Sequence, residues 1–350
     1  MAYTTIDDPE KHFNTKIYTG NLTQRPVVGL NHQPDFLWFK NRDTTNSHNI
    51  LDSTRGTDEK LEGPDNTNQA ASTSTRLDSF DSDGYTVETD PSVNGNGDQM
   101  VVWSWKANGG TRTTNSESGN NPAGGYQANT TAGFSIVDYV GTGATGTMAH
   151  GLGAIPDMII FKDRSEAAAW IVYHKNIGNG GGLKLDTNAA KFTESTLFNN
   201  TSPTSSVFTV GSANNINKND NNFIAYCFTS IQGYSRFGKY TGNGNANGTF
   251  IYTGFKPSFI MFKATAGTEN WGIFDNRRNT QQGNPRDIYL LPSVGNADSS
   301  ESDSVDFLSN GFKWRIDSGF RNDNGIEFVY MAFAESPFVT SNAAPGNGAF

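Results

Sequence analysis

The chain has 350 residues, a formal net charge of −9 and 12% aromatic residues, and it is rich in Gly, Asn, Thr and Ser. This composition favours short strands joined by turns over helices, and the length suits two or three domains. The acidic balance disfavours a nucleic-acid partner, because it repels phosphate backbones.

Neither export nor membrane insertion is predicted. The first residues lack a basic segment followed by an apolar one, and no apolar run approaches the ~18 residues that a membrane span needs. We therefore expect a protein made and kept in a cytoplasm. The single cysteine, Cys227, excludes an intrachain disulfide and is expected to be a small buried residue.

One apolar segment led by proline occurs three times. The copies are QPDFLWFK at 33–40, IPDMIIFK at 155–162 and KPSFIMFK at 256–263. Tyrosines that precede a glycine turn recur at nearly the same offsets, at Tyr18, Tyr139 and Tyr240. Two landmarks at matched spacing indicate an internal repeat.

The Pro-led segments are apolar on successive residues, which predicts strands covered on both faces. Each proline is expected to open its strand where the missing N–H is tolerated. The lysines that end the segments are expected to mark the return to water, at Lys40, Lys162 and Lys263.

Three further strands follow in each copy, in the same order. They are expected within 48–52, 81–87 and 94–105, within 170–174, 205–210 and 217–228, and within 271–275, 308–314 and 321–333. β-Branched and aromatic runs between Gly, Asn and Asp residues support these strands. The predicted fold class is all-β, with three tandem antiparallel β-sandwich repeats of the jelly-roll or lectin-like kind, although a flattened barrel would give the same pattern.

The repeats define the expected domains. These are a segment at 1–17, repeats at 18–107, 133–239 and 240–338, a linker at 108–132 and a tail at 339–350. The Gly, Ser, Asn and Thr content of the linker predicts flexibility. Each repeat is large enough for its own core, so we expect beads on a string, with the second and third repeats in a fixed orientation because no linker separates them.

Two motifs resemble cofactor or metal sites. GTGATG at 141–146 fits a dinucleotide fingerprint, but no helix can follow it, so its glycines are expected to form a turn. Asp81, Asp83 and Asp90 lie at spacings close to those of a calcium loop, where the hairpin turn is the simpler explanation. We expect no cofactor and at most a structural calcium ion.

No catalytic pattern is evident, and the protein is expected not to be an enzyme. There is no nucleophile elbow and no cysteine with a plausible partner. A glycan depolymerase would need a pair of carboxylates at a groove. Asp52, His174 and Asp275 occupy one position of the repeat, but the second is not acidic.

The six tryptophans raise the possibility of a sugar site, since aromatic rings stack on apolar sugar faces. Most of these rings lie in alternating strands and are expected to form cores. Trp314, Arg277 and Arg278 fall where turns are expected, and they are therefore the candidate ligand-binding residues.

The third repeat carries YTGNGNANGTFIYTGFKPSFIMFK, SNGFKW and FVYMAFAESPF. It resembles a repeat domain of virion structural proteins from marine bacteriophages that infect cyanobacteria and SAR11-like bacteria. The opening MAYTTIDDPEKHFNTKIYTGN and the middle ANTTAGFSIVDYVGTG are similar to the same family, so the resemblance covers nearly the whole chain. It implies a virion component and supplies no catalytic residues; the first repeat departs from the pattern in its short YTGNLTQRP turn.

The leading hypothesis is a tail fibre or fibre-like appendage that attaches to a host-surface glycan, in a particle assembled in the host cytoplasm. The N-terminal segment, with Asp7, Asp8 and Phe13, would attach it to other virion proteins. A homo-oligomer, specifically a trimer, is expected. The alternatives are a capsid decoration or head-fibre protein of purely architectural role and, from another class, a glycan depolymerase.

Overall fold

The structure is a computed structural model of the whole chain, and it describes residues 2–63, 70–71, 75–279 and 283–346. The described chain is nearly all β, and every strand pairing in it is antiparallel. Its helices are a 3-10 turn, η1 (Pro9–Lys11), and three four-residue helices. The prediction of an antiparallel all-β fold is confirmed.

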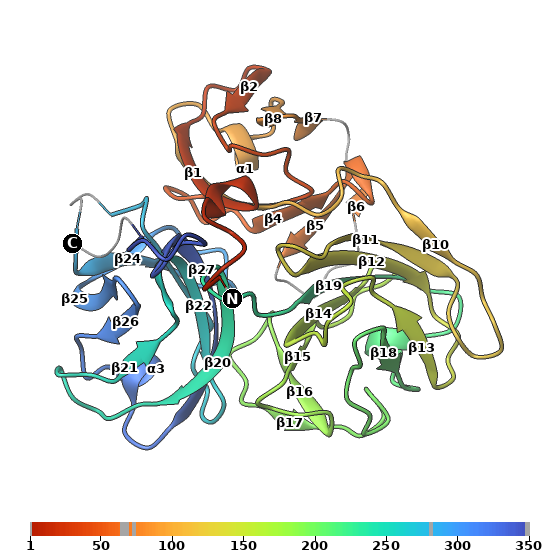
Figure 1. Cartoon of the computed structure of the whole chain (residues 1–350). Coiled ribbons are helices and arrows are strands. Elements are labelled where there is room, and N and C mark those ends of the chain that lie inside the picture. Colours follow the sequence, from red (N-terminus) through yellow and green to blue (C-terminus); the bar gives the residue numbers. More distant parts are fainter. Residues whose placement is uncertain (1, 64–69, 72–74, 280–282, 347–350) are drawn as a thin grey trace.

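The strands form three units, which appear around a common centre in Figure 1. Unit 1 contains β1 (Phe13–Thr19), β2 (Arg25–Val28), β3 (Phe36–Asn41), β4 (His48–Asp52), β5 (Gly56–Gly63), β6 (Ala70–Ala71), β7 (Leu77–Asp81), β8 (Gly84–Val87), α1 (Pro91–Asn94) and β9 (Gln99–Trp105). Unit 2 contains β10 (Thr113–Asn115), β11 (Gly124–Asn129), β12 (Phe134–Val140), β13 (Gly146–Ala149), β14 (Met158–Asp163), β15 (Ile171–His174), β16 (Gly181–Lys184), β17 (Phe192–Thr193), β18 (Val207–Val210), α2 (Asn214–Asn217) and β19 (Asn222–Phe228). Unit 3 contains β20 (Ser235–Thr241), β21 (Phe250–Tyr252), β22 (Phe255–Ala264), β23 (Gly272–Asp275), β24 (Arg286–Leu290), β25 (Ser299–Leu308), β26 (Gly311–Trp314), α3 (Gly319–Asn322) and β27 (Glu327–Pro337).

One strand order recurs in the three large sheets. It runs β1-β9-β3-β4-β5 in unit 1, β12-β19-β14-β15-β16 in unit 2 and β20-β27-β22-β23-β24 in unit 3. The first strand of each repeat, which is β1, β12 or β20, therefore pairs with the last strand of its unit, and the Pro-led strand lies on the other side of that last strand. A smaller sheet, β2-β8-β7 or β13-β18, accompanies the large one in units 1 and 2, whereas in unit 3 the pair β21-β26 continues the large sheet through β25.

The segment 108–132 is not a simple linker. Its strands β10 and β11 extend the large sheet of unit 2, with β11 paired along β12. Although its side chains are mostly polar, its backbone N–H and C=O groups complete a ladder that the edge of β12 leaves open. The expectation of a flexible linker is therefore corrected.

The units share one core, which corrects the expectation of beads on a string. Along β3, Phe36 and Trp38 point into a central cluster, while Leu37 and Phe39 point into a core of unit 1 alone. The Pro-led strands β14 and β22 alternate in the same way. The prediction that these strands are covered on both faces is thus confirmed. One face is covered by the strand's own unit and the other by the two neighbouring units.

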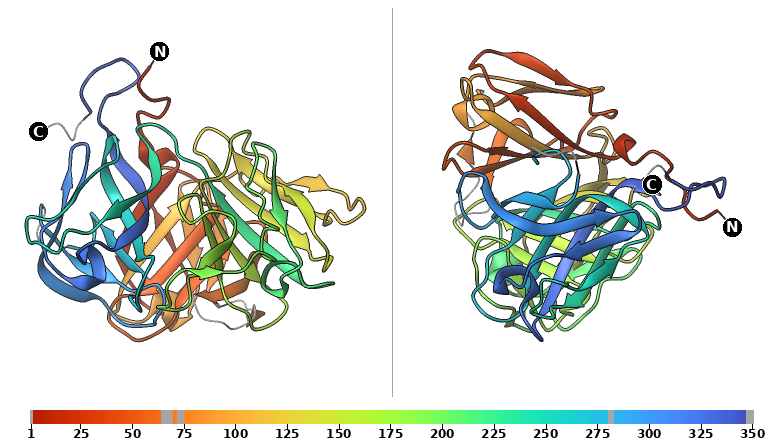
Figure 2. Two further views of the ribbon diagram at one scale, coloured as in Figure 1. Left: turned by 90° about the horizontal axis from the view of Figure 1, so that it is seen from below. Right: turned by 90° about the vertical axis from the view of Figure 1, so that its left-hand side faces the viewer.

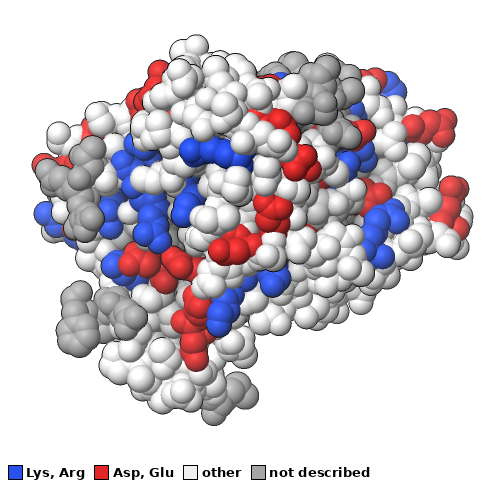
Figure 3. Space-filling model, turned by 90° about the horizontal axis from the view of Figure 1, so that it is seen from above, with Lys and Arg blue, Asp and Glu red and all other residues white. Residues whose placement is uncertain are grey.

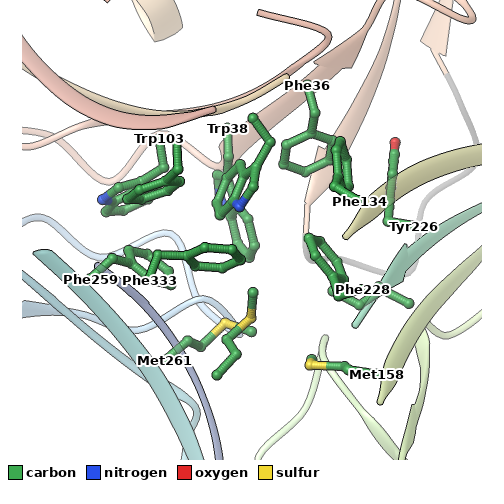
Figure 4. Packing of buried hydrophobic residues seen from close by; sticks show 14 of the residues in the cluster. Phe36, Trp38, Trp103, Phe134, Met158, Tyr226, Phe228, Phe259, Met261 and Phe333 are labelled. Carbon is green, nitrogen blue, oxygen red and sulfur yellow. The ribbon is translucent and has the colours of Figure 1, made fainter. Parts of the chain in front are cut away.

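Aromatic rings from all three units meet in this central cluster (Figure 4). The ring of Trp105 in unit 1 lies 5.5 Å from that of Phe333 in unit 3, and Phe36 lies 4.6 Å from Tyr226 in unit 2, measured between ring centroids. Edge-to-face pairs at these distances stabilise beyond simple burial, by about 0.5–1.5 kcal/mol each. A unit separated from the other two would expose its share of these apolar side chains to water.

The three lysines that end the Pro-led segments are buried, so the expectation that they return to water is wrong. The Nζ atoms of Lys40, Lys162 and Lys263 donate to the carbonyl oxygens of Thr44, Ala168 and Ala264 at 2.9, 2.5 and 2.9 Å. Lys40 and Lys162 lie beneath the loop after their strands, whereas Lys263 donates to the last residue of its own strand and, at 3.4 Å, to the carbonyl oxygen of Asn188 in unit 2. In each case carbonyl oxygens replace water. Burial lowers the pKa of Lys40 and of Lys263 to about 8.

Each unit contains a helix lock, which joins its first strand to the short helix before its last strand. The Oη atoms of Tyr18, Tyr139 and Tyr240 donate to the helix carbonyl oxygens of Val93, Ile216 and Arg321. A Cβ atom added at Gly141 would lie 2.2 Å from the carbonyl oxygen of Lys218, and Gly20 and Gly242 are equally close to the backbone in their units. Only glycine permits this approach, which explains the Tyr-x-Gly signature.

The last residue of each helix completes the lock. Asn94, Asn217 and Asn322 are fully buried. In unit 2, the amide nitrogen of Asn217 donates to the carbonyl oxygens of Ala144 and Gly211, and its Oδ1 accepts the N–H of Thr142 at 2.9 Å. One side chain thereby satisfies two backbone groups in the turn after the tyrosine and one, that of Gly211, between β18 and α2.

The N-terminal segment belongs to the folded body. β1 begins at Phe13, so the first unit starts before the expected boundary at residue 18. The Oη of Tyr3 donates to the carbonyl oxygen of Gly254, and Asp7 accepts hydrogen bonds from the backbone N–H and hydroxyl of Ser341. The two terminal segments consequently project together from one end of the molecule (Figure 2).

The shared core predicts cooperative unfolding. We expect one thermal transition for the intact chain, with equal calorimetric and van 't Hoff enthalpies, because no unit can lose its central face alone. Residues 133–239 expressed separately are expected not to fold, as judged by amide dispersion in NMR. Three resolved transitions, or a folded 133–239 fragment, would contradict the shared core.

The helix lock predicts a large effect of a single amide. Asn217→Ala removes the side-chain partner of three backbone groups, one in a buried and two in part-buried hydrogen bonds. We therefore expect a loss of about 3 kcal/mol in the free energy of unfolding, measured with urea. Asn219→Ala, at an exposed position of the same turn, is the control and should change that energy by less than ~0.5 kcal/mol. Equal effects of the two substitutions would show that the lock does not stabilise the unit.

Candidate functional site

The tryptophans are core residues and do not form a surface platform. All six are buried, and Trp314, the candidate ligand-binding ring, is fully buried against Phe262 at 4.9 Å. Trp314 lies in a strand, β26, and not in the turn that the sequence suggested. It is therefore removed as a contact for a ligand.

The two candidate arginines also serve the fold. Arg278 is buried, with its Nε 2.6 Å from Asp275 and its Nη1 2.9 Å from Asp298. Arg277 is half-exposed and forms an ion pair with Glu10 at 2.9 Å. Of the predicted ligand-binding residues, only Arg277 has a side chain that reaches a surface cleft.

The candidate calcium ligands do not converge. Asp81 accepts from the hydroxyl of Thr86, Asp83 accepts backbone N–H groups of a neighbouring loop, and Asp90 caps the N-terminus of α1 and pairs with Arg76 at 2.8 Å. Among the described residues, no group of three or more His, Cys, Asp or Glu side chains is arranged to hold a metal ion. The hairpin explanation for Asp81 and Asp83 agrees with the turn between β7 and β8.

The residues proposed for particle attachment have different environments. Phe13 is buried in the central cluster, stacked on Phe333 at 4.8 Å, so it is not available to a partner. Asp7 accepts hydrogen bonds from Ser341, which lower the pKa of its carboxyl group. Asp8 lies at the surface, where Lys11 is 3.6 Å away.

The repeat position shared by Asp52, His174 and Asp275 joins neighbouring units. Asp52 accepts from the hydroxyl of Tyr226 in unit 2 at 2.8 Å, and Asp275 accepts from the indole N–H of Trp103 in unit 1 at 3.1 Å. His174 contacts the carbonyl oxygen of Tyr330 in unit 3 at 3.4 Å. These contacts join unit 1 to unit 2, unit 2 to unit 3 and unit 3 to unit 1, so each unit is linked to both of the others.

The two acids at this position are not suited to proton transfer. Arg55 lies 2.5 Å from Asp52 and Arg278 lies 2.6 Å from Asp275, all four side chains being fully buried. Burial alone raises the pKa of Asp275, but the Arg278 guanidinium lowers it below its ordinary value. The buried Cys227 thiol has a pKa raised by desolvation, which disfavours the thiolate.

Open clefts lie where the first strand of one unit faces another unit. The β20 cleft, of about 470 Å³, is lined by β20, by residues 249–252 and by Lys175 and Asn176 of unit 2. The β1 cleft, of about 740 Å³, is lined by residues 14–17 of β1 and by Asn276, Arg277, Asn279, Arg286 and Glu335 of unit 3. Counted from Tyr18 and Tyr240, residues 14–17 and 236–239 are equivalent, so the two clefts are counterparts.

The third junction is filled by the chain itself. There β11 covers the edge of β12, and the amide nitrogen of Gln127 donates to the hydroxyls of Ser53 and Thr54 at 2.8 and 2.5 Å. The clefts are thus the two places where this cover is missing.

The β20 cleft presents exposed aromatic rings. Phe250 and Tyr252, in β21, are 44% and 47% exposed, whereas Ile251 between them is buried. The Oη of Tyr252 lies 3.3 Å from the Oη of Tyr3, which donates its own proton to Gly254. Desolvation, followed by the contact with Tyr252, raises the pKa of Tyr3 to about 12, so the Tyr3 hydroxyl remains protonated near neutrality.

Polar groups surround these rings. Lys175 pairs with Asp157 at 3.0 Å and Lys239 pairs with Glu327 at 2.6 Å, so their charges are balanced. Arg236 is exposed on the floor formed by β20. Rings beside neutralised polar groups can stack on a sugar and bind its hydroxyls.

The β1 cleft is more strongly charged. Lys256 pairs with Glu335 at 3.0 Å, whereas Lys16 and Arg286 have no carboxylate within 4.0 Å among the described residues. Arg286 is 7% exposed, and burial lowers the pKa of its guanidinium. On the face seen in Figure 3, basic and acidic side chains lie directly beside one another.

Comparison with known families treats the three units as one domain. A family model described as a domain of unknown function (DUF7483) matches residues 8–337. The chain belongs to this family. The match spans all three units as a single domain, which agrees with their shared core. No curated protein and no solved structure matches the chain, and none of the described helices is long and apolar enough to cross a membrane.

Apart from Arg277, sequence reasoning missed the residues of both clefts. The alternation in TFIYTG, where every second residue is exposed, was the available signal for Phe250 and Tyr252. The extra residues 108–132 at one boundary between repeats were the signal for a filled edge. Neither signal locates a cleft. Each cleft forms between two units, and the way in which the units pack cannot be derived from local sequence patterns.

The contact of His174 predicts a pH dependence. Its Nδ1 accepts the N–H of Asn176 at 3.2 Å, so the ring is neutral, and desolvation lowers its pKa to about 4. Because the pKa is lower in the folded state than in the unfolded one, the stability contributed by His174 is complete above ~6.5 and is lost as the pH falls through about 4.

We therefore expect the free energy of unfolding of His174→Gln to fall less steeply than that of the wild type between pH 6.5 and 4, by up to ~1.4 kcal/mol per pH unit. Urea unfolding at several pH values measures both slopes. Asn219→Ala is the control and should keep the wild-type slope. Identical slopes for His174→Gln and the wild type would contradict a neutral His174 in the fold.

Proposed function

We propose that the protein is a non-enzymatic structural protein of a bacteriophage particle that binds a host-surface glycan through the β20 cleft. The sequence resemblance described above supports the virion assignment. The observation that carries the glycan assignment is the exposed pair Phe250 and Tyr252 at the mouth of a polar cleft. In this proposal each unit is a lectin-like sandwich, and the particle contains a homo-oligomer, specifically a trimer.

Attachment to the particle fits the end of the molecule where both terminal segments lie. The contact between Asp7 and Ser341 holds these segments together, and the side chain of Asp8, the next residue, is 42% exposed. Tyr3 of the N-terminal segment lies 3.3 Å from Tyr252 between their Oη atoms, so this end also borders the β20 cleft, and in this proposal particle and host bind at adjacent surfaces. The protein then acts as a tail fibre or fibre-like appendage.

A second candidate, a capsid decoration protein of architectural role, is favoured by the shared core. A chain of separate domains would form an extended fibre, whereas three units around one core form a compact block. Labelling of the protein on intact particles distinguishes a position on the head from one on the tail.

The glycan proposal predicts the effect of removing both rings. We expect Phe250→Ala combined with Tyr252→Ala to weaken binding to host envelope polysaccharide at least about fivefold, because aromatic stacking contributes about 0.5–1.5 kcal/mol for each ring. Binding is measured with immobilised polysaccharide and with intact host cells. Both side chains are exposed, so the thermal midpoint should change little.

Val28→Ala is the matched control, since Val28 is an exposed apolar residue of unit 1, outside both clefts. It should bind as the wild type does. Absence of wild-type binding would favour the architectural role, and wild-type affinity in the double variant would remove the β20 cleft as the site. Steady release of reducing sugar from the polysaccharide would overturn the non-enzymatic assignment and favour a depolymerase.

A further inference from the structure

The first strand of unit 1 has one unpaired edge. The N–H of Gly20 donates to Asp98 and the N–H of Lys106 donates to His12, which places the even residues of β1 in the ladder with β9. In an antiparallel pair the odd residues then direct their N–H and C=O groups away from the partner. The backbone groups of Thr15 and Ile17 have no hydrogen-bond partner among the described residues.

Unit 2 shows what fits this edge. There β11 pairs along β12 in antiparallel register, from Gly124 opposite Tyr139 to Asn129 opposite Phe134. The N–H of Val140, equivalent to Thr19 of β1, donates to the carbonyl oxygen of Ala123 at 3.0 Å. The same edge of the same repeated strand is therefore filled by an extended segment in one unit and open in another (Figure 1).

The corresponding edge in unit 3 is partly satisfied by local side chains. The N–H of Phe237 donates to the hydroxyl of Ser230 at 3.2 Å, and the carbonyl oxygen of Thr241 accepts from the hydroxyl of Thr249 at 2.8 Å. No such substitute serves β1. The open ladder is thus concentrated in the β1 cleft.

Buried polar atoms without partners line the same cleft. They are the Oγ1 of Thr15, the Oδ1 of Asn276 and the Nε of Arg286. Thr15 and Arg286 are 4% and 7% exposed. Buried polar groups are normally hydrogen-bonded, so this cluster indicates a polar occupant.

The charges of the cleft indicate the chemistry of that occupant. In unit 2 the added hairpin brings Arg112 against Asp138 of β12, with nitrogen to oxygen distances of 2.7 and 2.8 Å. In unit 1 the equivalent of Asp138 is Ile17, and the cations Lys16 and Arg286 have no carboxylate partner within 4.0 Å among the described residues. The complementary segment must supply acidic side chains.

We propose that the β1 cleft binds an extended acidic segment of another protein, which adds to the sheet as a strand antiparallel to β1. Its backbone pairs with Thr15 and Ile17, as β11 pairs with β12. Its carboxylates meet Lys16 and Arg286. Addition of a strand to an open sheet edge is a general mode of peptide recognition, and it is independent of the glycan assignment.

The test begins with a random library of seven-residue peptides displayed between Gly-Ser spacers and selected on the intact protein. The expected winners alternate Asp or Glu with strand-forming residues. Their affinities are then measured by fluorescence anisotropy with synthetic, fluorescein-labelled copies. Failure to enrich any peptide overturns the proposal.

Two variants test separately whether the peptide pairs with the backbone of β1 and whether it binds through charge. The first tests the backbone. Ile17→Pro removes an N–H that faces away from β9, which an edge strand tolerates, and it should weaken the selected peptides at least tenfold. The matched control Ile17→Ala keeps that N–H and should bind within about threefold of the wild type, since exposed side-chain changes are small. Equal binding by Ile17→Pro and Ile17→Ala overturns strand addition.

Lys16→Glu leaves every backbone N–H in place and remains informative if Ile17→Pro does not fold. It should lower the affinity for acidic peptides at least tenfold and reduce its salt dependence. Acidic peptides that bind Lys16→Glu as they bind the wild type overturn the proposal. Sedimentation that reveals a dimer abolished by Ile17→Pro assigns the edge to a second copy of the chain and also overturns it.

Both lines of test remain separate from the glycan experiment. Ile17 and Lys16 line the β1 cleft, whereas Phe250 and Tyr252 line the β20 cleft. Ile17→Pro is expected to keep wild-type binding to polysaccharide. The failure of one assignment therefore leaves the other standing.

Discussion

The shared aromatic core is the constraint on which the rest of the structure depends. Each Pro-led strand contributes alternate side chains to this core and the intervening ones to the core of its own unit. Three large sheets consequently face one another, and their relative positions are fixed by close packing. The junctions between units, and therefore the clefts, are consequences of that packing.

Around this core, some features are the same in all three units and others differ between them. The helix lock of tyrosine, glycine and asparagine recurs in all three units, because each unit must connect its first and last strands in the same way. The exceptions lie at the junctions. Unit 2 fills the edge of its first strand with β11, unit 3 satisfies part of that edge with Ser230 and Thr249, and unit 1 leaves it open.

Residues that resembled functional groups proved to be structural, for a common reason. Trp314, Arg278 and the lysines of the Pro-led segments all occupy positions where strands end and loops begin, which the sequence predicts to be exposed. In the folded chain a neighbouring loop or unit covers these positions. Arg278 pairs with Asp275 and Asp298, and Lys40 donates to loop carbonyl oxygens, so their charges are compensated inside the protein.

The sequence by itself determined the antiparallel all-β class, the threefold repetition and the strands covered on both faces, because these depend on local periodicity and on matched spacing. Only the tertiary structure decided what covers those strands, that 108–132 completes a sheet, and that clefts form beside β1 and β20. The physical reason is that burial between units and unpaired sheet edges depend on contacts between distant residues. The local sequence around Ile17 or Phe250 does not show that a cleft forms beside it, because the other side of the cleft comes from a distant part of the chain.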